Sequence, residues 1–181
     1  MHALIEGFLG LLAPHHCLAC DQPSDPASPF CPPCATVLEP SSDLGSVFEY
    51  GGAIADAIQR FKYDGRSELG TPLGELMADA ARRAGLHVDA VVPVPLHWRR
   101  RRKRGYDQAA LLARPVAKAL GVPAMLRGLR RVRNTPSQVD LPFRDRQQNV
   151  AGAFAPWRLR GLRRALLIDD VRTTGATLDA A

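Results

Sequence analysis

Apolar residues recur at helical spacing in several segments of the chain. In the clearest of them, Ile54, Ile58 and Phe61 fall on one face. A stripe at positions i, i+3 or i+4, and i+7 is typical of a helix that packs one side against a core. The segments that predict amphipathic helices are residues 4–12, 53–63, 71–84 and 109–120.

Shorter apolar runs predict buried strands. Residues 90–95, Ala-Val-Val-Pro-Val-Pro, and residues 166–168, Leu-Leu-Ile, show no polar alternation, as in strands that are covered on both faces. Residues 47–50 predict a further short strand. Helical and strand segments alternate along the chain, and this order favours a parallel, doubly wound α/β sheet.

The composition fits one globular domain with a small appendage. The chain has 181 residues, 46% of them hydrophobic, and a formal net charge of +6. That charge favours polyanionic partners, or it only keeps a basic surface soluble. No apolar run approaches the roughly 20 residues of a membrane span, and residues 4–12 lack the basic flank of a signal peptide. We therefore expect a cytoplasmic protein without membrane insertion.

The cysteines form two Cys-x-x-Cys pairs near the N-terminus. They are Cys17, Cys20, Cys31 and Cys34. Paired knuckles of this spacing supply four thiolates to a tetrahedral Zn²⁺ and leave no open position for catalysis. The pattern therefore predicts a structural zinc site, and the alternatives are a redox dithiol or unliganded thiols. His15 and His16 are either substitute ligands or surface residues.

The most informative stretch is residues 166–177, Leu-Leu-Ile-Asp-Asp-Val-Arg-Thr-Thr-Gly-Ala-Thr. A buried strand leads into two carboxylates, then into a hydroxyl-rich turn and a helix start whose N–H groups suit a phosphate. Asp169 and Asp170 would repel a phosphate, but they accept hydrogen bonds from sugar hydroxyls. The pattern indicates a sugar-phosphate site. The alternatives are an ordinary strand–turn–helix corner with surface acids and a receiver-like acidic pocket.

This stretch resembles the signature of type I phosphoribosyltransferases, which bind 5-phosphoribosyl-1-pyrophosphate (PRPP) together with Mg²⁺. The resemblance implies that the acidic pair holds the ribose hydroxyls and that the turn holds the 5′-phosphate. The PRPP-binding residues that it implies are Asp169, Asp170, Thr173, Thr174, Gly175, Ala176 and Thr177.

Residues 92–110, VPVPLHWRRRRKRGYDQAA, carry a second resemblance. Together with the cysteine pairs and the PRPP-type turn, they resemble the ComF family, which is related to amidophosphoribosyltransferases and linked to DNA uptake. Residues 135–138 and 144–154 fit the same family, although Asp107 stands where the family usually has Asn. The resemblance implies a type I phosphoribosyltransferase-like α/β fold with a parallel sheet and a small N-terminal zinc-ribbon module.

Two basic segments are further candidates. One is a run of six cations, bordered by Trp98 and Tyr106 and expected on a loop, which suits pyrophosphate or nucleic acid. Its residues are Arg99, Arg100, Arg101, Arg102, Lys103 and Arg104. The other, residues 127–148, predicts a long polar loop. In the family's fold such a loop is a flexible hood that excludes water from PRPP; the alternative is a mobile loop that binds nothing specific. The expected hood residues are Arg133, Gln138, Arg144 and Arg146.

Two functions follow from the sequence, and they do not exclude each other. The first is a PRPP-dependent phosphoribosyltransferase, whose acceptor and catalytic residues the sequence does not identify. The second is a non-catalytic protein of natural transformation that binds single-stranded DNA, with other competence proteins as partners. We expect a helix and zinc module over residues 1–45 and a phosphoribosyltransferase-like domain over residues 46–181. Because a PRPP loop is normally followed by a full helix and a strand, we expect the second domain to be C-terminally incomplete.

Overall fold

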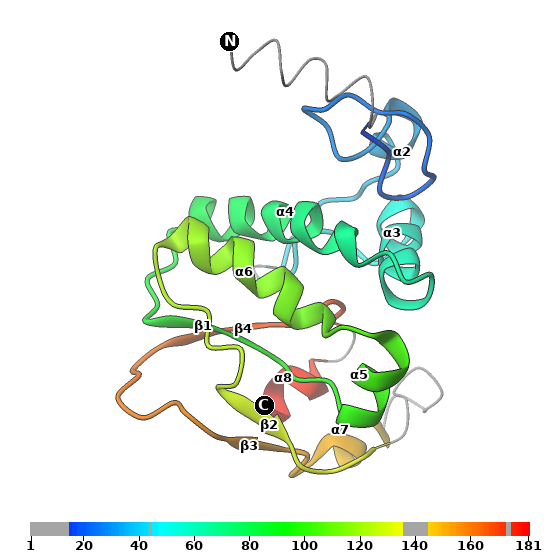
Figure 1. Cartoon of the computed structure of the whole chain (residues 1–181). Coiled ribbons are helices and arrows are strands. Elements are labelled where there is room, and N and C mark those ends of the chain that lie inside the picture. Colours follow the sequence, from blue (N-terminus) through cyan, green and yellow to red (C-terminus); the bar gives the residue numbers. More distant parts are fainter. Residues whose placement is uncertain (1–14, 44, 136–144, 173–174) are drawn as a thin grey trace.

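The computed structural model describes residues 15–43, 45–135, 145–172 and 175–181 (Figure 1). In chain order its elements are α2 (Pro32–Ala35), α3 (Gly52–Tyr63), the 3₁₀ helix η1 (Ser67–Leu69), α4 (Gly70–Arg83), β1 (Ala90–Pro93), α5 (Trp98–Arg104), α6 (Gln108–Leu120), β2 (Leu129–Arg131), α7 (Asp145–Val150), β3 (Phe154–Pro156), β4 (Ala165–Ile168) and α8 (Ala176–Ala180). The cysteine loops lie at one end of the molecule beside α3, and the β2–β3 hairpin lies toward the other end.

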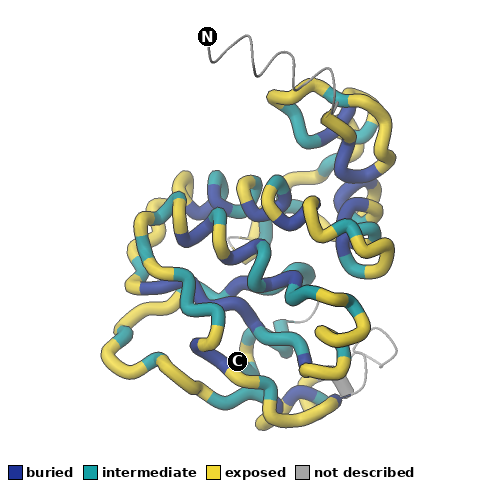
Figure 2. Tube along the Cα trace, in the orientation of Figure 1, coloured by how far each residue is buried: buried dark blue, intermediate teal, exposed yellow. Residues whose placement is uncertain are grey.

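Helices α4 and α6 lie side by side over the β1–β4 pair (Figure 1). They approach closely at Gly74, where an added Cβ would lie 2.8 Å from the carbonyl oxygen of Leu112 and 2.9 Å from Cγ of Pro115. Glycine therefore allows the two helices to pack almost backbone to backbone. Buried positions of α4 face α6, α6 also contacts the strands, and exposed positions of both helices face outward (Figure 2).

Strands β1 and β4 pair in parallel, with Ala90 opposite Ala165 and Pro93 opposite Ile168. A short extended segment around Ala124 runs parallel to β1 along its other edge. There, the N–H of Met125 donates to the carbonyl oxygen of Val91 at 2.8 Å. Parallel pairing brings the carboxyl ends of β1 and β4 to the same edge. The chain that leads into α5 and the chain that follows β4 therefore leave the sheet side by side.

A second, smaller core lies beside the hairpin. Val150, Ala153 and Ala176 are buried together, with Phe154 packed against them. Through these residues, α7 and the start of β3 contact α8, the helix that follows the acidic pair. The segment on the N-terminal side of β3 is thus anchored next to the predicted phosphate turn.

The structure confirms most of the predicted elements. The three predicted helices from residue 53 onward correspond to α3, α4 and α6, and the two longer apolar runs are the paired strands β1 and β4. Residues 47–50 do not form the predicted strand. Phe48 makes only a single antiparallel bridge, to Pro40. The described residues thus form a mixed α/β structure with a small parallel sheet, and the helix predicted over residues 4–12 lies outside them.

Candidate functional site

The four cysteines form one cluster. The Sγ atoms of Cys17, Cys20, Cys31 and Cys34 lie within 4.8 Å of one another. The Sγ atoms of Cys20 and Cys31 are 3.6 Å apart, too far for a disulfide of about 2.05 Å, and all four thiols are free. Thiolates at about 2.3 Å from one tetrahedral Zn²⁺ are about 3.8 Å apart. The cluster therefore fits a single Zn²⁺ with four sulfur ligands.

The electrostatics of the cluster favour a bound cation. Burial raises the pKa of the Cys17 thiol, but hydrogen bonds from the N–H groups of Cys20, Cys31 and Ala19 outweigh burial and lower this pKa to about 6. Burial, together with hydrogen bonds to the other thiols, raises the pKa of Cys34. One thiolate is therefore stabilised, whereas four would repel one another. A divalent metal ion removes that repulsion.

Neither neighbouring histidine joins the cluster. His15 and His16 are exposed, and Nδ1 of His16 lies 2.7 Å from the carbonyl oxygen of Asp21. The described groups that meet at the candidate metal site are the four cysteines alone. The alternative of histidine as a substitute ligand is therefore not supported.

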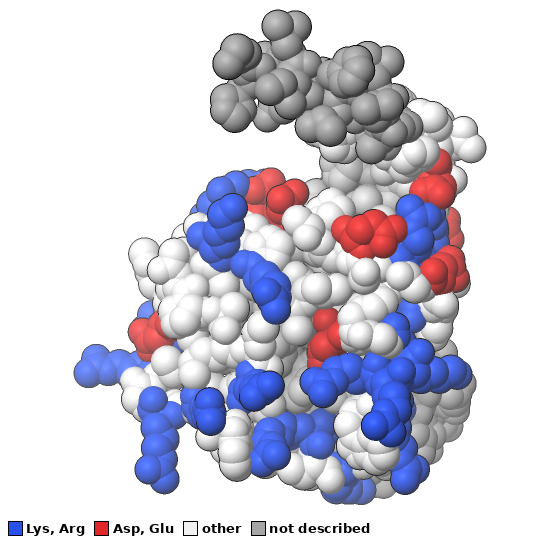
Figure 3. Space-filling model, viewed as in Figure 1, with Lys and Arg blue, Asp and Glu red and all other residues white. Residues whose placement is uncertain are grey.

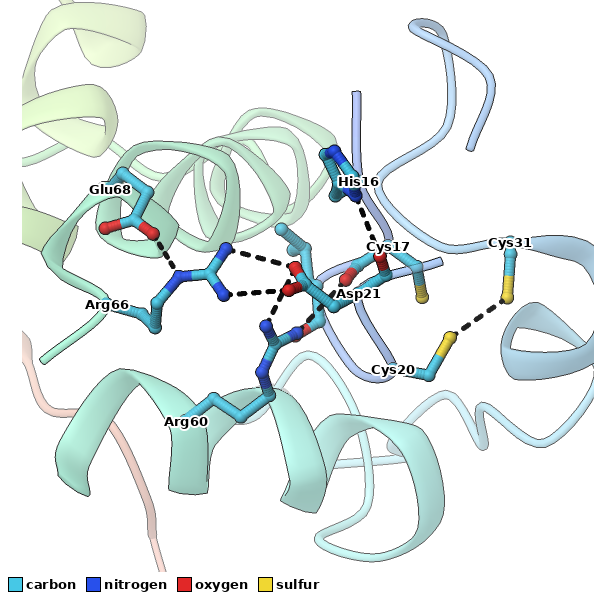
Figure 4. Close-up of polar contacts among 9 residues, drawn as sticks. His16, Cys17, Cys20, Asp21, Cys31, Arg60, Arg66 and Glu68 are labelled. Carbon is cyan, nitrogen blue, oxygen red and sulfur yellow. Dashed lines mark hydrogen bonds and ion pairs between the residues drawn. The ribbon is translucent and has the colours of Figure 1, made fainter. Parts of the chain in front are cut away.

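Asp21, directly after Cys20, ties the cysteine loops to the rest of the molecule (Figure 4). Its carboxylate accepts hydrogen bonds of 3.1 Å from both terminal nitrogens of Arg66 and lies 2.8 Å from Nη2 of Arg60. Hydrogen bonds from Arg66 and then Arg60 hold the pKa of Asp21 well below its usual range. The sequence analysis missed this anchor, because both arginines lie some forty residues after Asp21 in the chain.

The acidic pair lies directly after β4. The N–H of Asp170 donates to a carboxylate oxygen of Asp169 at 2.9 Å, and Oδ1 of Asp170 lies 2.8 Å from Nζ of Lys62 on α3. Burial and repulsion from Asp170 raise the pKa of Asp169 to about 7, although the charges of Lys62 and Arg131 act against that rise. The two carboxyl groups thus differ, since Asp170 has a cationic partner and Asp169 is the group that takes a proton near neutral pH.

The turn after the acidic pair is described in part. Thr173 and Thr174 lie outside the described residues. Gly175 has a φ of 78°, in the left-handed region that glycine adopts without strain, and it starts α8. Ala176 and Thr177 are the first two residues of that helix. Arg172 forms an ion pair with Asp43, which fixes the chain just before the undescribed residues.

The basic run was expected on a loop, but it forms helix α5. His97 caps the N-terminus of the helix, and its side chain accepts a hydrogen bond from the N–H of Arg99. Gly105, with a φ of 86°, caps the C-terminus. These caps, and the favourable position of cations near a helix C-terminus, offset the repulsion along the run. The helix starts at the carboxyl end of β1, so the basic run and the acidic pair share one edge of the sheet.

The six cations of α5 do not all face solvent. Arg100 donates to the carbonyl oxygen of Thr135 at 2.8 Å, and the Arg104 guanidinium lies 5.1 Å from the centre of the Tyr63 ring. The exposed members are Arg99, Arg101, Arg102 and Lys103. Lysine and arginine side chains gather over the half of the visible face that carries α5 and the hairpin (Figure 3).

The two aromatic residues beside α5 differ in their surroundings. Trp98 is 54% exposed, and the guanidinium groups of Arg99 and Arg102 lie within 6 Å of its ring. Tyr106 instead stacks on Phe61, with ring centres 5.7 Å apart, and its hydroxyl donates to the carbonyl oxygen of Phe61. The expectation that both rings are available for base stacking is therefore wrong for Tyr106.

The segment predicted as a long loop is partly ordered into elements. Residues 127–148 contain β2 and the start of α7, because Leu129 is buried and Arg131 packs over the ring of Phe154 across the hairpin. Of the hood candidates, Arg133 donates to the carbonyl oxygen of Ala151, and Arg146 belongs to α7. Gln138 and Arg144 lie outside the described residues.

The sequence analysis did not recognise three charged or polar residues that lie near this edge of the sheet, namely Asp107, His97 and Lys62. Asp107 caps α6 and accepts hydrogen bonds of 3.3 Å from the N–H groups of Leu96 and Ala110. Burial raises the pKa of Asp107. Burial, and then the nearby arginine charges, lower the pKa of His97. Lys62 is the third, and its position two residues after Arg60 on α3 gave no sequence signal for a partner beyond residue 160.

A hollow of about 460 Å³ opens beside β4, with Asp169 and Asp170 at its rim. Its walls come largely from the apolar faces of α3, α4 and α6, including Ile58, Leu76 and Val116. Apolar walls do not suit a sugar phosphate. The polar groups that do are those that line the hollow at the end of β4, among them Asp169, Asp170 and Arg172.

Comparison with known proteins was made by sequence. No family model matches the chain. The chain is 35% identical over 150 residues to Competence protein F of Haemophilus influenzae, covering 78% of this chain and 66% of that protein. It is 34% identical over 168 residues to DNA utilization protein YhgH of Salmonella typhimurium, covering 90% of this chain and 74% of that protein. The chain belongs to the ComF family.

The YhgH protein of Escherichia coli is similar at 32% identity over 167 residues, which cover 74% of its length. This ComF-family chain thus spans about two thirds to three quarters of the relatives that it matches. In the part of the chain that the structure describes, no helix has both the length and the apolar character needed to cross a membrane.

Proposed function

We propose that this ComF-family protein binds a ribose phosphate such as PRPP at the carboxyl ends of β1 and β4, within a phosphoribosyltransferase-like fold. The observation that carries the proposal is the acidic pair directly after β4, on the same edge of the sheet as the basic helix α5. Ligands of parallel α/β sheets bind outside the carboxyl ends of the strands. Carboxylates suit sugar hydroxyls, and guanidinium groups suit phosphate and pyrophosphate.

In this proposal each group has one role. Asp169 and Asp170 accept hydrogen bonds from the ribose hydroxyls, and the turn over residues 173–177 holds the 5′-phosphate. The exposed cations of α5 receive the pyrophosphate. When bound, Mg²⁺ neutralises part of the pyrophosphate charge. Transfer would break the bond between C1 and the pyrophosphate oxygen and form one to a nitrogen acceptor, whose identity the site does not define.

The cysteine cluster has a structural role in the same proposal. Four sulfur ligands close the coordination sphere of Zn²⁺, so no position remains for a substrate or an activated water. The loops that carry the cysteines contain only the four-residue helix α2. Metal binding would therefore supply much of their folding energy.

A thermal-shift series tests the ribose-phosphate site. PRPP with Mg²⁺ should raise the unfolding temperature of the full chain more than ribose 5-phosphate or pyrophosphate alone, because it engages both halves of the site. Asp170→Asn should reduce the shifts by PRPP and ribose 5-phosphate but not the shift by pyrophosphate. Thr174→Ala should reduce the shifts of the ligands that carry a 5′-phosphate. Asp56→Asn removes an exposed carboxylate on α3 and is the control.

If each ligand raises the unfolding temperature of wild type, Asp170→Asn, Thr174→Ala and Asp56→Asn equally, the ligand binds elsewhere on the protein.

A second candidate function is binding of single-stranded DNA by α5. It is supported by the exposed Trp98 with two guanidinium groups against its ring, and by the names of the relatives, Competence protein F and DNA utilization protein. Stacking on an aromatic ring within a basic surface is the usual mode for single strands. Such a protein would act with other competence proteins in the uptake or use of DNA.

Fluorescence anisotropy with a labelled oligonucleotide tests this second function. If α5 serves both ligands, pyrophosphate should displace the oligonucleotide, and Trp98→Ala should weaken DNA binding without changing the PRPP shift. Binding that is insensitive to Trp98→Ala and to pyrophosphate would remove α5 as the DNA site.

A further inference from the structure

Helix α3 is held from two sides. On one side, Nη1 of Arg60 donates to the carbonyl oxygens of Cys17 at 3.3 Å and Leu18 at 3.0 Å, while Nη2 of the same residue lies 2.8 Å from Asp21 (Figure 4). On the other side, Nζ of Lys62 lies 2.8 Å from Oδ1 of Asp170. Residues two apart on a helix point in different directions. One helix therefore contacts the cysteine loop and the acidic pair at the same time.

The contact with the acidic pair is shielded from solvent, whereas Asp21 in the contact with the cysteine loop is 46% exposed. The side chains of Arg60, Lys62 and Asp170 are only 16%, 17% and 14% exposed. Ion pairs that water reaches poorly are stronger and more sensitive to position than surface pairs. A small shift of α3 would therefore change the strength of the Lys62–Asp170 ion pair, because little water is present to screen the two charges.

The apolar contacts of α3 follow the same path. Ile54, Ile58 and Phe61 belong to one continuous core that also contains Cys17 and Phe30 from the cysteine loops. The cysteine loops and α3 therefore pack into the same core.

We propose that α3 couples the cysteine metal centre to the acidic pair, with Lys62 as a positioning residue for Asp170. Metal in the cluster fixes the loop, Arg60 fixes α3 against the loop, and Lys62 is thereby held against the carboxylate. The coupling deepens the proposed function, since it makes ribose-phosphate binding depend on the metal.

Lys62 acts through charge and orientation. Its ammonium group offsets the repulsion between two adjacent carboxylates and fixes the direction of the Asp170 side chain. The other charged groups that face the pair are Arg131 from β2 and Asp107 from the start of α6. Without Lys62 the pair holds a proton more tightly, and its oxygens lose the fixed direction in which they accept hydrogen bonds from a ligand.

Titration of PRPP with Mg²⁺ into the full chain tests the coupling. Lys62→Gln should weaken binding on the order of tenfold, and Lys62→Arg should restore most of the affinity because it keeps the charge. Removal of zinc by a chelator, followed by dialysis, should weaken wild-type binding similarly, but it should have no further effect on Lys62→Gln. Arg60→Gln should retain zinc and bind as weakly as the zinc-free protein.

Matched controls separate this path from a general loss of charge. Lys118→Gln removes an exposed lysine at the end of α6, and Arg82→Gln removes an exposed ion pair with Asp79 on α4. Neither should change the affinity or its dependence on zinc. If zinc removal weakens wild type and Lys62→Gln by the same factor, or if Arg60→Gln binds as wild type does, the coupling is overturned.

A ligand-free measurement distinguishes failure of the coupling from failure of the proposed function. Carbon-13 NMR of the aspartate carboxyl groups should show that Lys62→Gln, Arg60→Gln and zinc removal each raise the pKa of Asp169. If PRPP does not bind wild type but this pKa responds, the coupling stands and the proposed ligand is wrong. If the pKa of Asp169 responds only to Lys62→Gln, the path from the metal to the acidic pair is overturned. Arg60→Gln decides this even if zinc removal unfolds the loops, because this variant keeps the metal.

Discussion

Asp169→Asn is expected to stabilise the protein at pH 8 and to have a much smaller effect at pH 5. Burial and the charge of Asp170 raise the pKa of Asp169 from 3.8 to about 7. The folded state therefore binds the proton more tightly than the unfolded state does. The stability that this protonation contributes is present below the unfolded pKa and is lost as the pH rises toward 7.

The magnitude follows from the two pKa values. At about 1.36 kcal/mol per pKa unit, ionising Asp169 in the folded protein costs up to about 4 kcal/mol at pH 8, and less than half of that at pH 5. Asparagine has nearly the same shape, still accepts the N–H of Asp170, and never ionises. The substitution should thus remove the cost at pH 8 while the rest of the site stays in place.

Urea unfolding at pH 5 and pH 8, followed by circular dichroism, measures the effect. The comparison of interest is the difference between Asp169→Asn and wild type at each pH, because groups far from the acidic pair titrate equally in both. Asp56→Asn, in an exposed position on α3, should show no such pH-dependent gain. If Asp169→Asn changes stability equally at both pH values, or destabilises more at pH 8, then the pKa of Asp169 is not raised in the folded protein.

Three further predictions concern the metal, the helix packing and α5. Cys31→Ser should release zinc and lower stability, because thiolate binding energy is folding energy for the loops; metal analysis that still finds one zinc per chain would contradict this. Gly74→Ala should cost about 1–3 kcal/mol in urea unfolding, because its Cβ would press on the backbone of Leu112; a neutral effect would mean that α4 and α6 lie farther apart. Replacing Arg101, Arg102 and Lys103 with Ala should flatten the dependence of log affinity for single-stranded DNA on log salt by up to about two units, at about 0.7 per phosphate; an unchanged slope would show that these exposed cations contact no phosphate.

The helices could be predicted because their apolar spacing is long and regular. Ile54, Ile58 and Phe61 define the buried side of α3 from sequence alone. The cysteines and the acidic pair were also recognisable, because each set is compact in sequence and its chemistry is specific. Their local arrangement needs few long-range contacts.

The remaining features depend on contacts between distant segments. The Lys62–Asp170 pair joins residues that no local pattern relates. The basic run was expected on a loop, but the caps at His97 and Gly105 favour a helix. The hairpin of β2 and β3 has only three residues in each strand, too few for a periodic signal.

Isothermal titration calorimetry of PRPP with Mg²⁺ tests whether the acidic pair forms a ribose-phosphate site. We expect one binding site per chain in wild type, with Asp170→Asn weaker by roughly ten- to a hundredfold and Asp56→Asn unchanged. Binding of equal affinity in Asp170→Asn, or no binding to a folded, zinc-loaded wild-type chain, would contradict the assignment of a ribose-phosphate site to the acidic pair.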